Sequence, residues 1–517
     1  MYASVKSCGL KGLRGYVAEV EVDSGRGLPG IDMVGRLSGE VREAKERTCV
    51  ALKNSDIEIP PLKITVNISP ADIIKTGTMY DLPIAAGILI SMGIIPEGLL
   101  KDWAMIGELG LNGEIRHING VLPMLMCLRD SGVKGCIIPA DNLREGINVQ
   151  GIDIIAPSTF SELLDILKSG SLEDMTYVKN NSDSMCSGTG SEELTQTVDD
   201  SEELDYADVM GQEVVKRAAM IGAAGGHHIL ISGPPGAGKS MIARRLSTIM
   251  PELTAEEKLE VSIVYSIAGM LNDKMAMIDK RPFLSPHHSI SSASLCGGGR
   301  LIRPGVISMA HKGVLFLDEL PEFSRECIEM LREPLEEKTI SVNRLNDSCV
   351  LPADFLMVAA MNPCPCGYYP NRNMCNCAPS AVARYRDKIS GPIKDRIDII
   401  VTAKALDPKR VIRGDKGLTS LVMRQKVMLA DRIQKERYRD EAIDKNGQLN
   451  GKLVGRYCVL GDKERAYMES VYEQMNLTAR SYHKLLKVSR TIADLEGEDR
   501  ISVDHIREAA CYRGFFN

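Results

Sequence analysis

Long apolar segments are missing from this chain of 517 residues. No stretch approaches the run of about 18 apolar residues that predicts a membrane-spanning helix. The first residues, MYASVK, also lack the apolar core of a secretory signal peptide. We therefore expect a cytoplasmic protein without membrane contact.

A large charge excess is missing too: the formal net charge is −6, so no overall positive field indicates nucleic acid. A basic surface confined to the channel of an oligomer remains compatible with this value.

The remaining composition is that of an ordinary globular protein, with 44% hydrophobic and 26% charged residues. The chain is too long for one core, and at roughly 100 to 200 residues per domain we expect three domains. Fourteen cysteines in a cytosolic chain favour reduced thiols and metal ligation over disulfides.

The most informative segment is a phosphate-binding loop, GPPGAGKS at 233–240, between an apolar strand at 229–231 and a helical pattern from about 239. Glycines let the backbone N–H groups surround phosphate oxygens, the lysine reaches the β- and γ-phosphates, and the serine hydroxyl can ligate Mg²⁺. With the acid described next, the residues expected to bind ATP and Mg²⁺ are Gly233, Pro234, Pro235, Gly236, Ala237, Gly238, Lys239, Ser240, Met241 and Asp318.

Two further apolar strands end in catalytic residue types. Residues 313–317 lead into Asp318, which can hold Mg²⁺ through water, and Glu319, which can orient and deprotonate the attacking water. Residues 355–361 lead into Asn362, whose amide can hold the lytic water and sense the γ-phosphate. Phosphoryl transfer also needs a cation on the developing charge. The candidates for that cation are Arg384, Arg386 and Arg396.

Four cysteines form two close pairs, Cys364 with Cys366 and Cys375 with Cys377, across an eight-residue loop after Asn362. Four thiolates at this spacing suit a closed tetrahedral Zn²⁺ site that stiffens the loop. Because each pair is CxC and not the commoner CxxC, reduced thiols or a redox-labile pair remain the alternative. The neighbouring histidines at 287 and 288 have no spaced partners and are interpreted as loop hydrogen-bonding groups.

The motifs together resemble the magnesium-chelatase-like AAA+ ATPases of the YifB/ComM type. The likeness covers nearly the whole chain and is carried by PHH at 286–288, GGG at 297–299, RPG at 303–305, LDELPEF at 317–323 and AAMNPCPCG at 359–367. It implies that Arg396, within GPIKDRID, is an arginine finger given in trans to the next subunit of a ring, which we expect to be a hexamer. A surface pair with Asp395 or Asp398 is the alternative for Arg396. The same resemblance makes Arg480 a sensor 2 residue facing phosphates, with an ordinary surface arginine as the alternative.

Two inserts of the ATPase module point to the ring channel in the relatives, at 285–307 and at 336–351, where a β-hairpin is expected. Their basic residues, Arg300, Lys338 and Arg344, could grip DNA phosphates, and structural packing is the alternative.

The N-terminal third resembles the Lon-protease-like domain of the ribosomal S5 domain 2 type. Asp81 aligns with the position of the nucleophilic serine and Leu122 with that of the catalytic lysine, so no activated nucleophile is expected. We interpret the domain as a scaffold or DNA-binding accessory. Its basic residues, such as Arg47 and Lys75, could contact phosphates or simply form a solvated face.

The predicted fold is multidomain α/β. We expect a Lon-like domain at 1–168, an acidic flexible linker at 169–204, an AAA+ P-loop core at 205–405 and a helical lid at 406–517. The predicted function is an ATP-dependent ring motor acting on single-stranded or branched DNA, with branch migration or helicase activity in recombination or transformation. A magnesium chelatase motor subunit acting on protoporphyrin and a Lon-like protease are the alternatives, and the domain content and residues 81 and 122 disfavour them.

Overall fold

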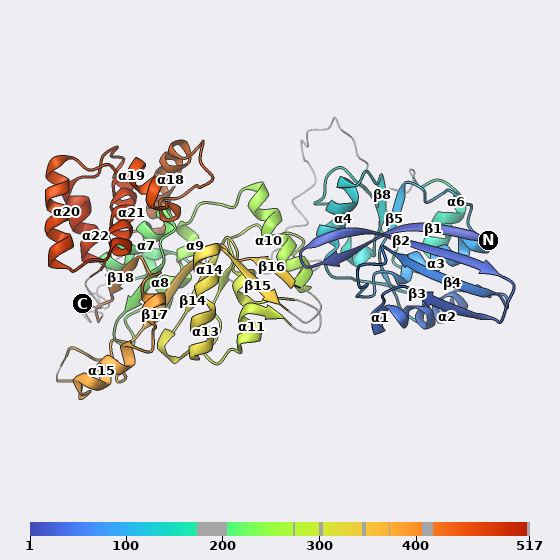
Figure 1. Cartoon of the computed structure of the whole chain (residues 1–517), viewed down its shortest axis with the longest axis horizontal. Helices are drawn as coiled ribbons and strands as arrows, with labels where there is room; N and C mark the ends of the chain where they lie inside the picture. Colours follow the sequence, from blue (N-terminus) through green and yellow to red (C-terminus); the bar gives the residue numbers. More distant parts are fainter. Residues whose placement is uncertain are drawn as a thin grey trace.

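The computed structural model describes residues 1–172, 204–271, 275–298, 303–343, 348–371, 373–405 and 417–513. The N-terminal domain and the C-terminal helices lie at opposite ends, with a second α/β unit between them (Figure 1). Most of the predicted linker, Arg300, Arg344 and the segment 406–416 fall outside the described residues. Across the part of the chain that is described, no helix combines the length and apolarity needed to cross a bilayer.

The N-terminal domain is built on a seven-stranded sheet in the order β3-β4-β2-β1-β5-β8-β9. Its first two strands form an antiparallel hairpin, and β1, β5, β8 and β9 run parallel. The strands are β1 (Tyr2–Lys11), β2 (Arg14–Gly25), β3 (Gly30–Val34), β4 (Lys63–Ser69), β5 (Trp103–Met105), β8 (Gly135–Ile137) and β9 (Asp153–Ile155), with a separate ribbon of β6 (Glu108–Leu109) and β7 (Ile115–Arg116).

Helices pack on this sheet through apolar faces, and α3 is buried along its whole length because its sequence is almost entirely apolar. The helices are α1 (Gly39–Arg42), α2 (Ala44–Asn54), α3 (Asp81–Ser91), α4 (Val121–Asp130), α5 (Leu143–Gly146) and α6 (Phe160–Ser169).

The second unit contains a five-stranded parallel sheet in the order β11-β14-β17-β10-β18. The strands are β10 (Ile229–Ser232), β11 (Phe283–Leu284), β14 (Val314–Leu317), β17 (Leu356–Met361) and β18 (Ile399–Thr402). The strands β10, β14 and β17 are buried throughout, as their continuous apolar sequences predict for a parallel sheet covered on both faces. Their carboxyl ends meet at one edge, so the loops that follow them converge.

Short helices and two hairpins surround this sheet. The helices are α7 (Glu213–Gly225), α8 (Lys239–Arg244), α9 (Leu246–Ile249), α10 (Ala255–Ala268), α11 (Ser292–Cys296), α12 (Val306–Met309), α13 (Arg325–Met330), α14 (Arg332–Glu337), α15 (Pro379–Arg386) and α16 (Gly391–Lys394). The hairpins are β12 (Gly297–Gly298) with β13 (Arg303–Pro304), and β15 (Thr339–Asn343) with β16 (Ser348–Pro352). The hairpin expected at 336–351 therefore starts later, and Glu336 belongs to α14.

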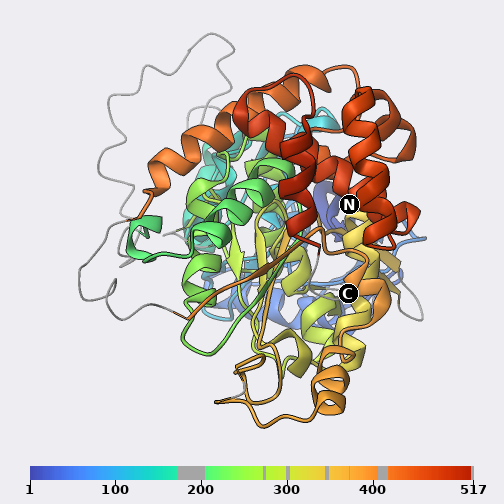
Figure 2. The same cartoon turned by 90° about the vertical axis from the view of Figure 1, so that its left-hand side faces the viewer.

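The C-terminal part is helical: α18 (Ser420–Arg437), α19 (Gly451–Tyr457), α20 (Asp462–Gln474), α21 (Ala479–Glu496) and α22 (Val503–Cys511). Both α18 and α21 pack on α7. Viewed from this end, these helices lie in front of the N-terminal domain (Figure 2). At the other end, α10 joins the second unit to the N-terminal domain, where Gly120 N–H donates to the Ser266 carbonyl at 3.1 Å and the Ser266 hydroxyl donates to Glu145.

Candidate functional site

The phosphate loop connects β10 to α8 and curves around open space. Gly236 and Gly238 have φ values of 75° and 82°, a left-handed conformation that glycine adopts at little cost. No atom lies within 4 Å of where a Cβ would stand on either glycine, so the loop faces an opening. Ala237 is buried inside the loop, and Met241 is exposed in the first turn of α8.

Lys239 lies across the mouth of this loop. Its Nζ donates to the carbonyl oxygens of Gly233 and Pro234 at 2.7 and 3.1 Å and to Asn362 Oδ1 at 3.1 Å. Burial lowers the pKa of Lys239, and the charges of Asp318 and Glu319 act in the opposite direction. In this structure, the Lys239 ammonium donates to neutral carbonyl and amide oxygens. The same donors can bind phosphate.

The two acids after β14 occupy different environments. Asp318 Oδ2 accepts from the Ser240 hydroxyl at 2.8 Å, so the two side chains expected at Mg²⁺ meet directly. Glu319 is half exposed and has a φ of 52°, which is unusual for a residue with a Cβ and is found at functional sites that hold a side chain in a set direction. Asp318 Oδ1 accepts from the N–H of Glu319 at 3.0 Å and supports that conformation.

A histidine that sequence reasoning treated as a loop residue lies beside Glu319. His288 Nδ1 is 3.7 Å from Glu319 Oε2, and its ring contacts His287 with centroids 4.1 Å apart. The order of the elements indicates this contact between His288 and Glu319. His288 follows β11, and β11 pairs with β14, the strand that ends before Glu319. His287 does form loop hydrogen bonds, because its Nδ1 accepts from the Ser289 N–H at 3.3 Å and lies 2.7 Å from the Ser289 hydroxyl.

These residues fit a Mg²⁺–nucleoside triphosphate. The open glycine loop leaves room for phosphate, Lys239 supplies a cation, and Ser240 with Asp318 offers two oxygen ligands of the type that Mg²⁺ prefers. Gln212, directly before α7, is tied to the same loop because its Nε2 donates to the Ala237 carbonyl at 3.0 Å.

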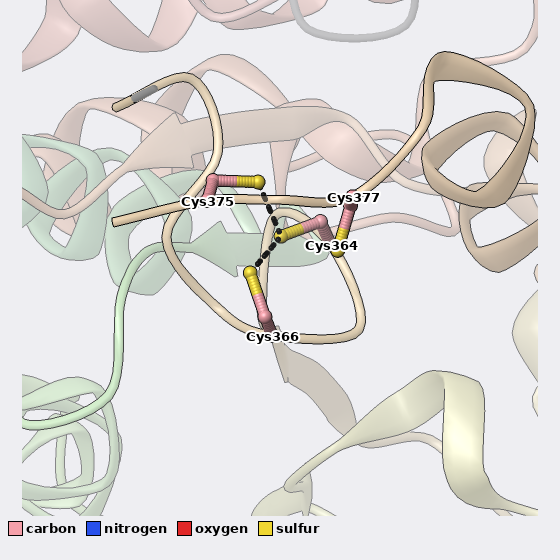
Figure 3. Close-up of side chains that lie close together, drawn as sticks. All are labelled: Cys364, Cys366, Cys375 and Cys377. Carbon is pink, nitrogen blue, oxygen red and sulfur yellow. Dashed lines mark hydrogen bonds between the residues drawn. The ribbon is translucent and has the colours of Figure 1, made fainter. Parts of the chain in front are cut away.

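The cysteine loop follows Asn362 and rests on the phosphate loop: a Cβ added to Gly367 would meet Pro235 Cδ at 2.7 Å. Figure 3 shows the four thiols pointing toward one another. The Sγ of Cys364 lies 3.3 Å from that of Cys366 and 3.7 Å from that of Cys375, and all four sulfur atoms lie within 4.8 Å of one another.

Four sulfur atoms bound to one Zn²⁺ at about 2.3 Å stand about 3.8 Å apart, so the four thiols fit a tetrahedral site. The sulfurs come from four separate side chains and need little rearrangement to reach this spacing. All described cysteines are free, as expected for reduced thiols.

The arginine candidates differ in their surroundings. Arg384 is exposed on α15, and Arg386 supports the cysteine loop, with its guanidinium 5.4 Å from the Tyr369 ring centroid. Arg396 is 10% exposed, and it pairs with Glu336 and donates to the Pro392 carbonyl at 2.7 Å. Its ionic partner is thus Glu336, and not Asp395 or Asp398 as in the surface alternative.

Arg480 also binds Glu336, with its Nη2 donating to Oε1 at 2.5 Å. The resemblance predicts that Arg480 faces phosphates. In the structure, Arg480 shares Glu336 with Arg396, and this contact does not connect it to Lys239, Ser240 or Asp318. Glu336 was missed because nothing in its local sequence distinguishes it, and its two partners lie 60 and 144 residues away.

The positions aligned with a protease active site hold no nucleophile. Asp81 is fully buried and accepts from Arg47 Nε and Nη2 at 2.7 and 2.8 Å. Leu122 is 1% exposed in the core. Lys75 is also buried and donates to the Ile73 carbonyl at 3.1 Å, so the expectation that Arg47 and Lys75 meet phosphates or form a solvated face is wrong. Lys338 lies at the base of the hairpin, directly before β15, and pairs with Asp354 at 3.1 Å.

Comparison with known proteins agrees with this geometry. Residues 205–411 match the family described as magnesium chelatase, subunit ChlI; residues 20–142 match subunit ChlI of Mg-chelatase; and residues 417–513 match its C-terminal family. The chain is 38% identical to competence protein ComM of Haemophilus influenzae over 99% of this chain and 97% of that protein. It is 36% identical to the uncharacterized protein YifB of Escherichia coli over 96% of this chain and 93% of that protein.

Similarity to a chelatase subunit is shorter. The magnesium-chelatase 67 kDa subunit of Chlorobaculum parvum is 29% identical over 31% of this chain and 23% of that protein. Full-length similarity to ComM and YifB, together with the three family matches, shows that the chain belongs to the YifB/ComM family of magnesium-chelatase-like AAA+ proteins.

Proposed function

We propose that the protein is a Mg²⁺-dependent ATPase that assembles into a ring, a hexamer, in the cytoplasm and uses ATP hydrolysis to move DNA. The observation that carries this proposal is the convergence of Lys239, Ser240, Asp318 and Asn362 at one edge of the parallel sheet, while Arg396 and Arg480 are held elsewhere by Glu336. One chain thus carries the binding half of a phosphoryl-transfer site and, at a separate place, the guanidinium half.

The roles follow from the chemistry of each group. Bound Mg²⁺ neutralises charge on the β- and γ-phosphates. Lys239 leaves its carbonyl partners and binds those phosphates, and Ser240 and Asp318 orient the metal. Glu319 takes a proton from the attacking water, whose position Asn362 fixes from the end of β17. Arg396 stabilises the developing charge in the neighbouring subunit, a contribution of about 10³ to 10⁵ in rate.

The domains take separate parts in this motor. We assign residues 406–517 as the helical lid, with Arg480 as sensor 2. Residues 1–168 are assigned as a Lon-like accessory domain. Residues 169–204 are assigned as an acidic linker that spans the distance between this domain and the ATPase core. The inserts at 285–307 and 336–351 line the channel and contact DNA. The four clustered cysteines hold Zn²⁺. The metal thereby fixes the cysteine loop, which follows Asn362 and rests on the phosphate loop.

Similarity to a relative named competence protein supports DNA as the substrate, with branch migration or unwinding during integration of incoming DNA as the activity. The chelatase alternative is favoured only by the family descriptions and by the shorter match to the 67 kDa subunit. The protease alternative has no support at the aligned positions, because Asp81 is bound to Arg47 and Leu122 is buried.

The test is ATP turnover of the full-length protein with forked DNA, with protoporphyrin plus Mg²⁺, and with casein as a control. We expect forked DNA alone to stimulate turnover and strand movement to depend on ATP. Stimulation by protoporphyrin, or no response to DNA, would reject the proposed substrate.

A further inference from the structure

Glu336 connects two cations that come from separate parts of the chain. Its Oε2 accepts from Arg396 Nη2, which follows α16, and its Oε1 accepts from Arg480 Nη2, which lies in the first turn of α21. Each carboxylate oxygen therefore serves one guanidinium. The exposed fractions of the side chains are 10% for Arg396, 43% for Glu336 and 54% for Arg480, so the cluster opens to the surface on the side of Arg480.

The two arginines are held at a fixed spacing by other contacts. Lys484 Nζ, one turn along α21 from Arg480, is 2.8 Å from Asp398 Oδ1, two residues after Arg396. Arg513 donates to the Ile397 carbonyl at 3.2 Å and to the Ser481 hydroxyl at 3.0 Å. These bonds fasten α21 to the segment of Arg396, so the guanidinium pair does not depend on Glu336 for its relative position.

The pair has unused capacity for an anion. Two guanidiniums share a single carboxylate, so the three groups carry a net charge of +1. Arg396 Nε is also buried without a hydrogen-bond partner among the described residues. A terminal phosphoryl group carries more charge than a carboxylate and offers three oxygens, so it is the stronger ligand for two guanidiniums. The Glu336 carboxylate thus stands where a phosphoryl group can bind, and it is the weaker of the two anionic ligands.

We infer that Glu336 is a positioning residue that occupies the donors of Arg396 and Arg480 in the free chain and gives them up to the terminal phosphate of a nucleotide bound in the adjacent subunit. This inference rests on the proposed ring ATPase. It makes assembly selective for ATP over ADP, because only ATP presents the γ-phosphate that outcompetes the carboxylate. Contact with the neighbour is thereby conditional on its nucleotide state.

The test compares Glu336→Gln with Glu337→Gln in the full-length protein. Glu337 is the adjacent exposed acid, so both variants lose the same charge from the same helix end. Oligomer formation is measured by mass photometry and sedimentation against protein concentration, with ADP and with a non-hydrolysable ATP analogue. We expect Glu336→Gln to assemble at a concentration about three- to tenfold lower than the control, the scale of exposed and half-exposed ion pairs. We also expect its preference for the ATP analogue over ADP to shrink.

Glu336→Asp provides a second variant if the glutamine variant unfolds. It keeps the charge but is one methylene shorter and cannot reach both guanidiniums, so a smaller shift in the same direction is expected. Equal assembly of the Glu336 variants and the Glu337→Gln control, with unchanged nucleotide preference, overturns the inference.

Arg396→Ala separates this failure from failure of the ring proposal. If Arg396→Ala retains full turnover, the trans arginine is wrong and the inference falls with it. If Arg396→Ala loses turnover while the Glu336 variants assemble like the control, only the role of Glu336 is rejected.

Discussion

A buried ion pair fastens the arginine segment to the C-terminal helices, and its removal gives the sharpest stability prediction. Asp398 and Lys484 have side chains only 11% and 12% exposed, with Oδ1 and Nζ 2.8 Å apart. Asp398 Oδ2 also accepts from His228 N–H at 3.3 Å. Burial acts to raise the pKa of Asp398, but Lys484 and His227 outweigh it and hold that pKa well below its ordinary value.

Asp398→Asn leaves the Lys484 ammonium buried without its counterion. Breaking a buried pair in this way costs about 3 to 5 kcal/mol. In a cooperative unit of about 300 residues, an unfolding entropy of about 2.1 cal/mol/K per residue makes each kcal/mol worth about 1.6 °C, so we expect the melting midpoint to fall by roughly 5 to 8 °C. The measurement is differential scanning calorimetry of the full-length protein, in which the transition of the ATPase and helical parts is identified by its shift with ATP.

Asp504→Asn is the matched control, because Asp504 pairs with Arg507 at 2.6 Å while both side chains are largely exposed. Such a pair contributes about 0.2 to 1 kcal/mol, so the control should move the midpoint by no more than about 2 °C. Lys484→Met in the Asp398→Asn background removes the unpaired charge and should restore part of the loss. A midpoint for Asp398→Asn equal to that of Asp504→Asn would refute the reasoning.

Three further predictions concern the catalytic base, the metal and pH. Glu319→Gln should keep nucleotide affinity in equilibrium binding but lower turnover by about 10² to 10⁴, and unchanged turnover would reject its role as base. The purified protein should contain one zinc per chain by elemental analysis, and Cys375→Ser should lose it while Cys458→Ser, a buried cysteine of the helical part, keeps it; equal zinc contents would contradict the site. Burial lowers the pKa of His228 to about 4, and its Nδ1 accepts from Met357 N–H at 3.1 Å. Because the unfolded chain binds this proton near pH 6.5, the stability due to neutral His228 is present above that pH and is lost as pH falls toward 4. His228→Asn, which keeps an acceptor, should flatten the pH dependence of the melting midpoint, and an unchanged slope would count against it.

Local patterns were sufficient to predict which residues gather at the carboxyl edge of the parallel sheet. Glycine spacing, strand apolarity and the residue after each strand are all local, and parallel strands in one sheet necessarily bring such residues to one edge. The contacts among Lys239, Ser240, Asp318 and Asn362 follow from that topology. The Cys364 and Cys375 pairs also meet as their spacing predicts.

Contacts between distant segments could not be predicted in the same way. The Glu336 cluster joins two arginines of known motifs through an acid that belongs to none, and the packing of Gly367 on Pro235 depends on how a loop folds back over another. The Arg47–Asp81 pair illustrates the same limit, since an acid at the start of an apolar helix predicts a cap and not a buried partner from α2.

The central claim is that each nucleotide site is shared by two subunits, and a mixing experiment tests it most directly. Lys239→Ala removes the binding half and Arg396→Ala removes the guanidinium half, so each variant alone should be inactive. In mixed rings, an Arg396→Ala subunit beside a Lys239→Ala subunit regains a complete site. Random equimolar mixing should then restore about a quarter of wild-type turnover, if the sites act independently. Full turnover by Arg396→Ala alone, or no recovery in the mixture, would contradict the shared site.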